Sequence, residues 1–475
     1  MADDDASKAV PQLDTGEMKK APSDIDEPSA RTRMARLREW GDQRPAWVQW
    51  TAVAGVFLIL SLVLAARFMP AKAALSRADE WVYIDAVDKA AHGEITRTGA
   101  IIDDYALDLI ACRGVELLGH MGDPCGTTYE ASDFPYGGVT SADIHSPVYY
   151  FGTAWLARVI QSVTPVDSLL LAARGTSVLW LGLGLTALVG LARTLGASRL
   201  ASAAVGLLVL ASPSVRWTNL YITPDALNLL AGSLVTIAAV KYARRQWSPW
   251  ILIGLSAAVT AVKAQNVIVV GLAALFLVLY AVTVAGGRSW RGIGRHLAVS
   301  AGALGAAVAV ELGYAVLRAH WAAGPPPLLD PAAPMRLAEM LNQSRSFLMA
   351  VSLGPDAAYQ PALAYTRPAL AATFISWLLA GGLIAGALFA RLDDLQTRLA
   401  QGTALAFLLA GPAIYTMIQL TTGRGFSLPD RYGMVMLPAM AAVTALLARR
   451  RWVQVLVIGL AVVAFAEAMV TLRMV

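Results

Sequence analysis

The sequence predicts an all-α polytopic membrane protein, a bundle of about eleven transmembrane helices with a long first extracytoplasmic loop that carries juxtamembrane helices. Three observations support this prediction. Of 475 residues, 57% are hydrophobic and only 15% are charged, which is more apolar surface than one soluble core can bury. Apolar runs of membrane-spanning length recur along the chain, and the basic residues gather between alternate runs.

Eleven apolar runs have the length expected of a helix that crosses a bilayer. They lie at residues 47–68, 168–192, 200–215, 225–240, 249–263, 266–285, 297–318, 369–389, 400–420, 432–447 and 452–471. The first run is long enough to stay in the membrane as an anchor, so we do not expect it to be a cleaved signal peptide. Residues 46–475 are therefore predicted to form one transmembrane domain.

Residues 1–45 differ from the rest of the chain because they are polar, contain proline and show no hydrophobic periodicity. Such a segment cannot bury enough apolar surface to fold by itself. We predict a disordered cytoplasmic tail.

The orientation follows from the positions of Lys and Arg. Basic clusters lie at 31–44, at Arg193 with Arg199, at Lys241 with Arg244 and Arg245, at Arg288 with Arg291 and Arg295, at Arg391 with Arg398, and at 449–451. All can be cytoplasmic together, which places the chain in the plasma membrane with its N-terminus inside and its C-terminus outside. This sorting explains the net charge of +5 better than a nucleic-acid partner does, because the charges share no single face.

Three segments are thereby assigned to the outer face, at 69–167, 319–368 and 421–431. The first is far longer than a connection requires, and loops of that size are usually functional. Within it, we expect one helix to start at a Ser76 cap and an amphipathic one to follow Pro147. We place the second helix on the outer interface, because a crossing there would move every later basic cluster outside.

Cys112 and Cys125 both lie in this first outer loop. Outside the cytoplasm they can oxidise to a disulfide. The alternative is a pair of free thiols in a reducing compartment.

Asp79 and Glu80 follow the first span by about ten residues, which places their carboxylates just above the predicted outer surface. A general base or a metal ligand that acts on a lipid-linked substrate would suit this position. The alternative is a solvated acidic pair at a helix N-terminus. Further acidic residues of the loop, Asp85, Asp88, Asp103, Asp104 and Asp108, can supply oxygen ligands or simply face solvent.

Other polar residues sit where apolar runs begin or end. His145 precedes Pro147 and can be a ligand or a helix cap, and Tyr149 and Tyr150 suit the headgroup zone. Candidates nearer the membrane are Arg216, Asp225, Lys263, Glu311, Arg424, Asp430, Arg431 and Tyr432. Ionisable groups at membrane depth are costly and count as functional candidates, although Lys263 can snorkel and Asp225 can cap its own helix.

The arginines among these candidates can bind a phosphate through bidentate hydrogen bonds. The alternative for Arg431 is an interfacial pair with Asp430 that anchors the helix. The chain has no phosphate loop after its glycine-containing GLGLTALVG stretch, no zinc-type Cys/His spacing and no nucleophile elbow. An enzyme of this sequence would therefore use a membrane-borne donor.

Four motifs in order resemble the GT-C superfamily of membrane glycosyltransferases. They are DEWVYIDAV from Asp79, HSPVYY from His145, ITPDALNLL from Ile222 and DRYGMVMLP from Asp430. Within the superfamily, the chain is most similar to the dolichyl-phosphate-mannose-protein mannosyltransferase-like group and to actinobacterial multi-spanning groups. Where some relatives carry Glu-Lys-Pro, this chain has His145-Ser146-Pro147, so the resemblance leaves phosphate binding to Arg431, Arg216 or Lys263.

The resemblance implies an inverting glycosyltransferase that moves a sugar from a polyprenyl-phosphate carrier to an extracytoplasmic lipid, glycan or protein. Asp79 would be the catalytic base with Glu80 beside it. The substrate-binding residues would be His145, Tyr149, Asp225 and Tyr432, together with Arg216, Lys263 and Arg431. Asp79, Glu80 and His145 would be the ligands of a possible divalent cation such as Mg, Mn or Ca. The rival interpretations are a transporter or flippase, with Lys263 and Glu311 lining a path, and a catalytically silent accessory protein.

Overall fold

The computed structural model describes residues 45–69, 74–76, 79–116, 118–285, 290–326, 336–349, 370–422 and 428–471. The chain divides into two units, Met1–Ala52 and Val53–Val475, and the second contains nearly all of the helices. The predicted disordered tail lies outside the described residues, apart from its last position. The described part is helical, and its only β-structure is three isolated bridges.

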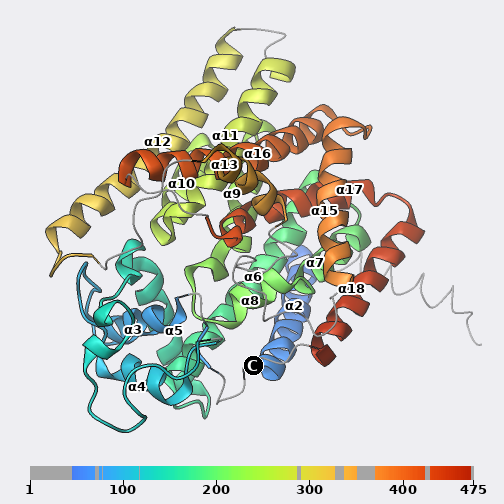
Figure 1. The fold of residues 1–475 in the computed structure, drawn as a ribbon. Coiled ribbons are helices and arrows are strands. Elements are labelled where there is room, and N and C mark those ends of the chain that lie inside the picture. The colour runs from blue at the N-terminus through green and yellow to red at the C-terminus, as the bar shows by residue number, and fades with distance from the viewer. Residues whose placement is uncertain are drawn as a thin grey trace, which may run out of the picture. The chain divides into compact units, whose positions relative to one another are not determined.

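Each of the eleven predicted apolar runs contains an α-helix (Figure 1). These helices are α2 (Ala46–Phe68), α6 (Leu169–Leu195), α7 (Arg199–Leu210), α9 (Asn228–Ala243), α10 (Pro249–Val262), α11 (Val267–Tyr280), α12 (Trp290–His320), α15 (Leu370–Leu388), α16 (Asp394–Thr422), α17 (Leu437–Leu447) and α18 (Arg451–Thr471). In the described part of the chain, six helical segments are long and apolar enough to cross a membrane. A seventh is α7 taken together with α8 (Pro213–Leu220), which bends away by 65°. The chain is thus a multi-pass helical membrane protein, and the count of eleven spans stays a prediction.

Several of these helices are interrupted where polar residues occur. Pro213 starts α8 after the bend, and Pro224 starts the short helix η4 (Pro224–Leu227) in front of α9. The short helices η5 (Ala264–Asn266) and η8 (Asp430–Met436) precede α11 and α17 in the same way. Irregular backbone at membrane depth must be enclosed by protein, because lipid offers its polar groups no partners. These breaks are therefore places where the fold can present polar side chains.

The first loop forms a small helical layer with its own hydrophobic core. It contains α3 (Glu80–Ala91), α4 (Asp104–Arg113) and α5 (Pro147–Val163), which lie together at one side of the bundle in Figure 1. The prediction that its first helix starts at Ser76 is wrong, because α3 starts four residues later. Asp79 takes a left-handed conformation with φ 67°, and the Ser76 amide donates to the Glu80 carboxylate instead of starting a turn. Asp tolerates this left-handed region better than most residues.

Helix α5 is amphipathic, as the sequence predicts. Tyr149, Tyr150 and Ala154 are buried on one side. The other side carries exposed large hydrophobic side chains, at Val148, Phe151, Trp155, Val159 and Val163. An apolar stripe of this kind suits a helix that lies in the membrane interface, and the interfacial placement of α5 stays a prediction.

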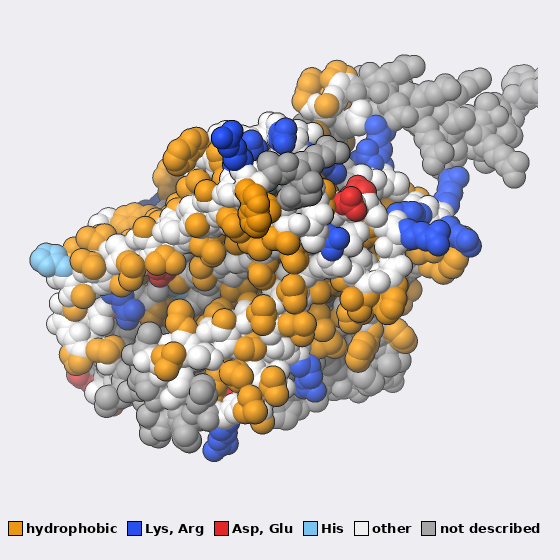
Figure 2. Space-filling view, turned by 90° about the horizontal axis from the view of Figure 1, so that it is seen from above, with side chains coloured by type: hydrophobic (Ala, Val, Ile, Leu, Met, Phe, Trp, Pro, Cys, Tyr) orange, Lys and Arg blue, Asp and Glu red, His pale blue; other side chains and the backbone are white. Residues whose placement is uncertain are grey.

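The described parts of the basic loops at 193–199, 241–245, 290–295, 391–398 and 449–451 lie together at one end of the helices. Arg244 donates to the carbonyl of Thr194, Gln396 donates to Leu195, Gln454 donates to Ser198, and Arg449 donates to Arg391. Arg295 lies over the ring of Tyr242 near the end of α9. Figure 2 shows several groups of Lys and Arg among mainly hydrophobic side chains, and few acidic ones. One end of the bundle therefore carries these described basic loops, as positive-inside sorting predicts, and the side of the membrane on which this end lies stays a prediction.

This grouping gives a direct test of orientation. Topology reporters fused after Ala197, Arg245 and Arg450 are expected to read cytoplasmic, and those after Ala131 and Pro334 are expected to read external, because basic loops stay inside. Pro334 itself lies outside the described residues. An external signal at Arg245 would overturn the orientation.

Candidate active site

Asp79 lies at the N-terminal end of α3 with 41% of its side chain exposed. Arg431 Nη2 lies 3.1 Å from its Oδ2, and Tyr83 lies close to the carboxylate. The crowding of protein atoms around the carboxyl raises the pKa of Asp79 above its usual value, and the charge of Arg431 opposes this rise. Asp79 is thus a carboxylate that a substrate can reach and whose basicity is increased.

Asp225 lies beside this carboxylate, inside the protein. Its side chain is 2% exposed and pairs with two cations. The ammonium of Lys263 contacts Oδ1, and Arg431 Nε lies 3.2 Å from Oδ2. Thr223 Oγ1 donates to Oδ2 at 3.1 Å and Asn228 Nδ2 donates to Oδ1 at 2.9 Å. Such complete pairing is what a buried charge needs.

The helix breaks bring this cluster together. Asp225 comes from η4, Lys263 is the C-terminal cap of α10, and Arg431 comes from η8. Tyr432 follows Arg431, and its ring lies 5.0 Å from the Lys263 ammonium, a distance at which a cation and an aromatic face attract. The sequence therefore identified four residues that the fold does assemble, together with Asp79, from distant parts of the chain.

His145 lies close to the cluster and is 4% exposed. Its Nε2 lies 3.3 Å from the Tyr83 hydroxyl. Burial, with Lys263 nearby, lowers the pKa of His145 to about 3. The imidazole is therefore neutral near pH 7 and offers a substrate phosphate no charge.

Glu80 has a different position from the one that was predicted. Its carboxylate is fully buried and accepts hydrogen bonds from Arg174 Nε and Nη2, at 2.8 and 2.7 Å. The backbone amides of Ser76 and Ile222 also donate to it, at 2.7 and 3.0 Å. With both oxygens occupied and no exposed surface, Glu80 cannot act on a substrate, so its prediction as a catalytic residue is corrected to a structural one.

Sequence reasoning missed Arg174 and Tyr83. Arg174 lies inside the apolar run at 168–192. The rule that an ionisable residue at membrane depth is a functional candidate singled out Lys263 and Glu311, and it would have identified Arg174 as well. Tyr83 follows Asp79 by four residues, the spacing that places two side chains on one face of a helix.

The possible metal ligands Asp79, Glu80 and His145 do not form a ligand set among the described residues. Glu80 turns to Arg174, and the Nε2 of His145 faces Tyr83. Among the described residues, the one group of His, Cys, Asp or Glu side chains close enough together to share a metal ion is Asp108 with Cys112 and Cys125. Both of those sulfurs are in a disulfide, so this group does not provide a donor set for Mg or Ca either.

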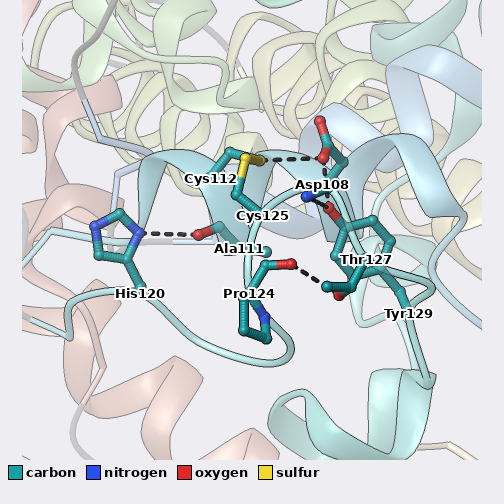
Figure 3. The surroundings of a disulfide bond; sticks show 9 residues. Asp108, Ala111, Cys112, His120, Pro124, Cys125, Thr127 and Tyr129 are labelled. Carbon is teal, nitrogen blue, oxygen red and sulfur yellow. Dashed lines mark hydrogen bonds between the residues drawn. A yellow bond between two sulfur atoms is a disulfide. The ribbon is translucent and has the colours of Figure 1, made fainter.

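Cys112 and Cys125 form this disulfide in the first loop, with their Cα atoms 4.5 Å apart (Figure 3). Asp108 Oδ1 lies 3.1 Å from Cys112 Sγ and accepts a hydrogen bond from the Tyr129 hydroxyl. His120 approaches the carbonyl of Ala111 at 2.9 Å. The bond ties the end of α4 to the segment that comes after it.

We expect the disulfide to form in protein taken from its native membrane, because the loop is predicted to face an oxidising compartment. Replacing both cysteines by serine should destabilise the loop by about 3 kcal/mol in the chain-entropy model. Mass spectrometry of the non-reduced protein checks the bond, and thermal unfolding of the variant checks its effect. Two alkylatable thiols would rule the bond out.

The remaining predicted residues lie apart from this cluster or outside the described part of the chain. Tyr149 is buried in the first-loop core, with its ring 5.5 Å from that of Tyr150. Arg216 belongs to α8, but its side chain is outside the described residues, as is Arg424. Glu311 is half-buried in α12.

Together, these features define a multi-pass helical membrane protein with a charged cluster where the helix breaks meet the first loop. Two crystal structures of ArnT from Cupriavidus metallidurans are similar to the chain. The one bound to undecaprenyl phosphate has 17% sequence identity and a TM-score of 0.43, over 85% of this chain and 60% of that chain. The apo structure has 17% identity and a TM-score of 0.37, over 92% of this chain and 78% of that chain. No protein-family model and no curated protein matches the chain.

Proposed function

We propose that this protein is an inverting glycosyltransferase of the GT-C type, which moves a sugar from a polyprenyl phosphate to an acceptor hydroxyl outside the cytoplasm. The observation that carries the proposal is the position of Asp79. It is a partly exposed carboxylate in contact with a buried cluster that holds two cations, Lys263 and Arg431. A base beside fixed positive charge is what a transfer with an anionic leaving group needs.

The reaction uses these residues in one displacement. The acceptor hydroxyl oxygen attacks the anomeric carbon, and its proton passes to Asp79. The bond between the anomeric carbon and the phosphate oxygen breaks, and its electron pair stays on the departing polyprenyl phosphate. Arg431 stabilises the charge that develops on that phosphate, and the buried Lys263 adds positive charge behind it without touching the substrate. Attack from the side opposite the leaving group inverts the anomeric configuration.

Asp225 fixes both cations in this scheme. It contacts Lys263 through one oxygen and Arg431 through the other. Because the cations are held before the substrate arrives, little reorganisation is needed during the reaction. Neutral His145 and Tyr83 provide hydrogen bonds beside Asp79 without adding charge.

The second outer segment supports the residues that would bind phosphate. It includes α13 (Leu337–Leu348). Gln343 of this helix accepts a hydrogen bond from the Leu428 amide at 3.1 Å. A side chain at Gly433 would come within 2.9 Å of the Phe347 backbone, so α13 packs directly on η8. We place acceptor selection in the first loop and in this segment, because the first loop carries Asp79 and α13 contacts η8, which carries Arg431.

Arg431→Lys tests the phosphate contact. Lysine keeps the charge but loses the planar fork, so we expect polyprenyl-phosphate binding to weaken about tenfold, the equivalent of about 1.4 kcal/mol. Titration of the purified, reconstituted protein with a polyprenyl-phosphate sugar measures donor binding. With a membrane extract as the acceptor source, the released carrier and the product measure transfer. Arg449→Lys, in a basic loop at the other end, is the matched control. Equal donor binding by both variants would remove Arg431 from the phosphate site.

A further inference from the structure

A buried ion pair lies outside the residues that the proposed reaction uses. Arg174 comes from α6 and Glu80 from the start of α3, and neither side chain has exposed surface. The guanidinium donates from Nε to Glu80 Oε1 at 2.8 Å and from Nη2 to Oε2 at 2.7 Å. This two-point geometry is the strongest and most directional form of an ion pair.

The pair also holds three pieces of backbone. Arg174 Nη2 donates to the carbonyl of Ala74 at 2.9 Å. The Glu80 carboxylate accepts from the amides of Ser76 and Ile222. The chain in front of α3, the first residue of α3 and the turn in front of η4 are thereby all tied to the transmembrane helix α6.

Two of these pieces carry the carboxylates that contact Arg431. Asp79 directly precedes Glu80, with its backbone in the left-handed region at φ 67°. Asp225 follows Ile222 by three residues. Arg431 reaches Asp79 Oδ2 at 3.1 Å and Asp225 Oδ2 at 3.2 Å. A shift of the backbone at Glu80 or Ile222 therefore changes the distance between the base and its cation.

We infer that Arg174 is a positioning residue for glycosyl transfer, which acts through Glu80 to hold Asp79 and Asp225 on Arg431. The inference rests on the proposed function. Tyr221 also contacts this ion pair. The Arg174 guanidinium lies 5.0 Å from the centre of the Tyr221 ring, and the Tyr221 hydroxyl donates a hydrogen bond to Glu116 at 2.9 Å. A displacement of about 1 Å at a reacting group can lower a rate about 100-fold.

A positioning role and a purely structural role differ in their effect on the pH profile. The charged and titratable groups around Asp79 are Arg431, Asp225, Tyr83 and Lys263. If Asp79 moves away from Arg431, the opposing charge is lost and the pKa of Asp79 rises further. Because the base must be deprotonated, the acid limb of kcat then moves to higher pH. A loss of folded protein lowers the amount of active enzyme and leaves that limb in place.

The test uses Arg174→Lys and Glu80→Asp in the full-length, reconstituted protein, with Arg193→Lys in the same helix as the control. Each variant is assayed for kcat, donor KM, the pH profile and thermal unfolding. We expect kcat per folded protein to fall at least about tenfold in both pair variants, with the acid limb shifted upward and the donor KM raised, because Asp225 also holds the cations that we assign to the phosphate. The Arg193 variant should match wild type. If Arg174→Lys does not fold, Glu80→Asp carries the same expectations.

A kcat and an acid limb like those of wild type in folded pair variants would overturn the positioning role. Asp79→Asn separates this failure from failure of the function. Full transfer by Asp79→Asn would remove the proposed function itself. If Asp79→Asn loses transfer while the pair variants behave like wild type, only the inference about Arg174 is wrong.

Discussion

Asp79→Asn is expected to lower glycosyl transfer by roughly two to four orders of magnitude. Asparagine preserves the size of the side chain and can still accept a hydrogen bond from Arg431, which lies 3.1 Å from Asp79 Oδ2. It cannot take the proton of the acceptor hydroxyl. Donor binding and folding should persist, because 41% of the Asp79 side chain is exposed and Lys263 and Arg431 keep their contacts with Asp225. Initial rates of product formation and donor titration check both parts.

Asp104→Asn is the matched control for this variant. Asp104 is an exposed acid in the first turn of α4, in the same loop. We expect this variant to retain transfer close to wild type. Similar losses in both variants would indicate a general effect of loop charge and would contradict the assignment of Asp79 as the base.

The second large effect concerns stability. Asp225→Asn should destabilise the protein by about 3–5 kcal/mol, because it removes the carboxylate that pairs with Lys263, whose side chain is 1% exposed. The double variant Asp225→Asn with Lys263→Met removes the stranded ammonium and should regain a large part of that loss. Thermal unfolding in detergent or in lipid measures both variants against wild type.

The comparison of the single and double variants decides whether Lys263 is charged in this site. A double variant less stable than the single one would contradict the ion pair as the reason for the loss. Neither variant should show normal donor affinity, since both disturb the cations that we assign to the phosphate.

Much of the fold can be predicted from the sequence because the membrane imposes simple rules. An apolar run of sufficient length must be helical, and a helix is found in each predicted run. The described basic loops lie at one end, which is the arrangement that charge sorting of the connections predicts. Asp225, Lys263 and Arg431 were identified for a related reason, since a charged residue at an apolar run must have a partner.

The functions of Asp79 and Glu80 could not be separated from the sequence. Their side chains point in different directions because consecutive residues do not share a helix face. Asp79 meets Arg431, more than three hundred positions away, while Glu80 meets Arg174 in α6. Only the packing of distant helices decides which carboxylate stays accessible. The possible metal set of Asp79, Glu80 and His145 does not form because Glu80 pairs with Arg174 and the Nε2 of His145 lies by the Tyr83 hydroxyl.

The start of α3 could not be predicted either. Ser76 has the features of a helix cap, but its amide donates to the buried Glu80 carboxylate, and α3 starts only after Asp79, whose backbone is left-handed. A local propensity was overruled by a tertiary ion pair.

The most direct test of the central claim compares Asp79→Asn with Glu311→Gln in the same vesicles, given a polyprenyl-phosphate sugar and an acceptor extract. Glu311 lies half-buried in α12, where a coupled transporter would need a titrating group. We predict that Asp79→Asn abolishes nearly all transfer and carrier release, and that Glu311→Gln keeps both within a few-fold of wild type. Full activity in Asp79→Asn together with its loss in Glu311→Gln would contradict the glycosyltransferase mechanism and favour transport.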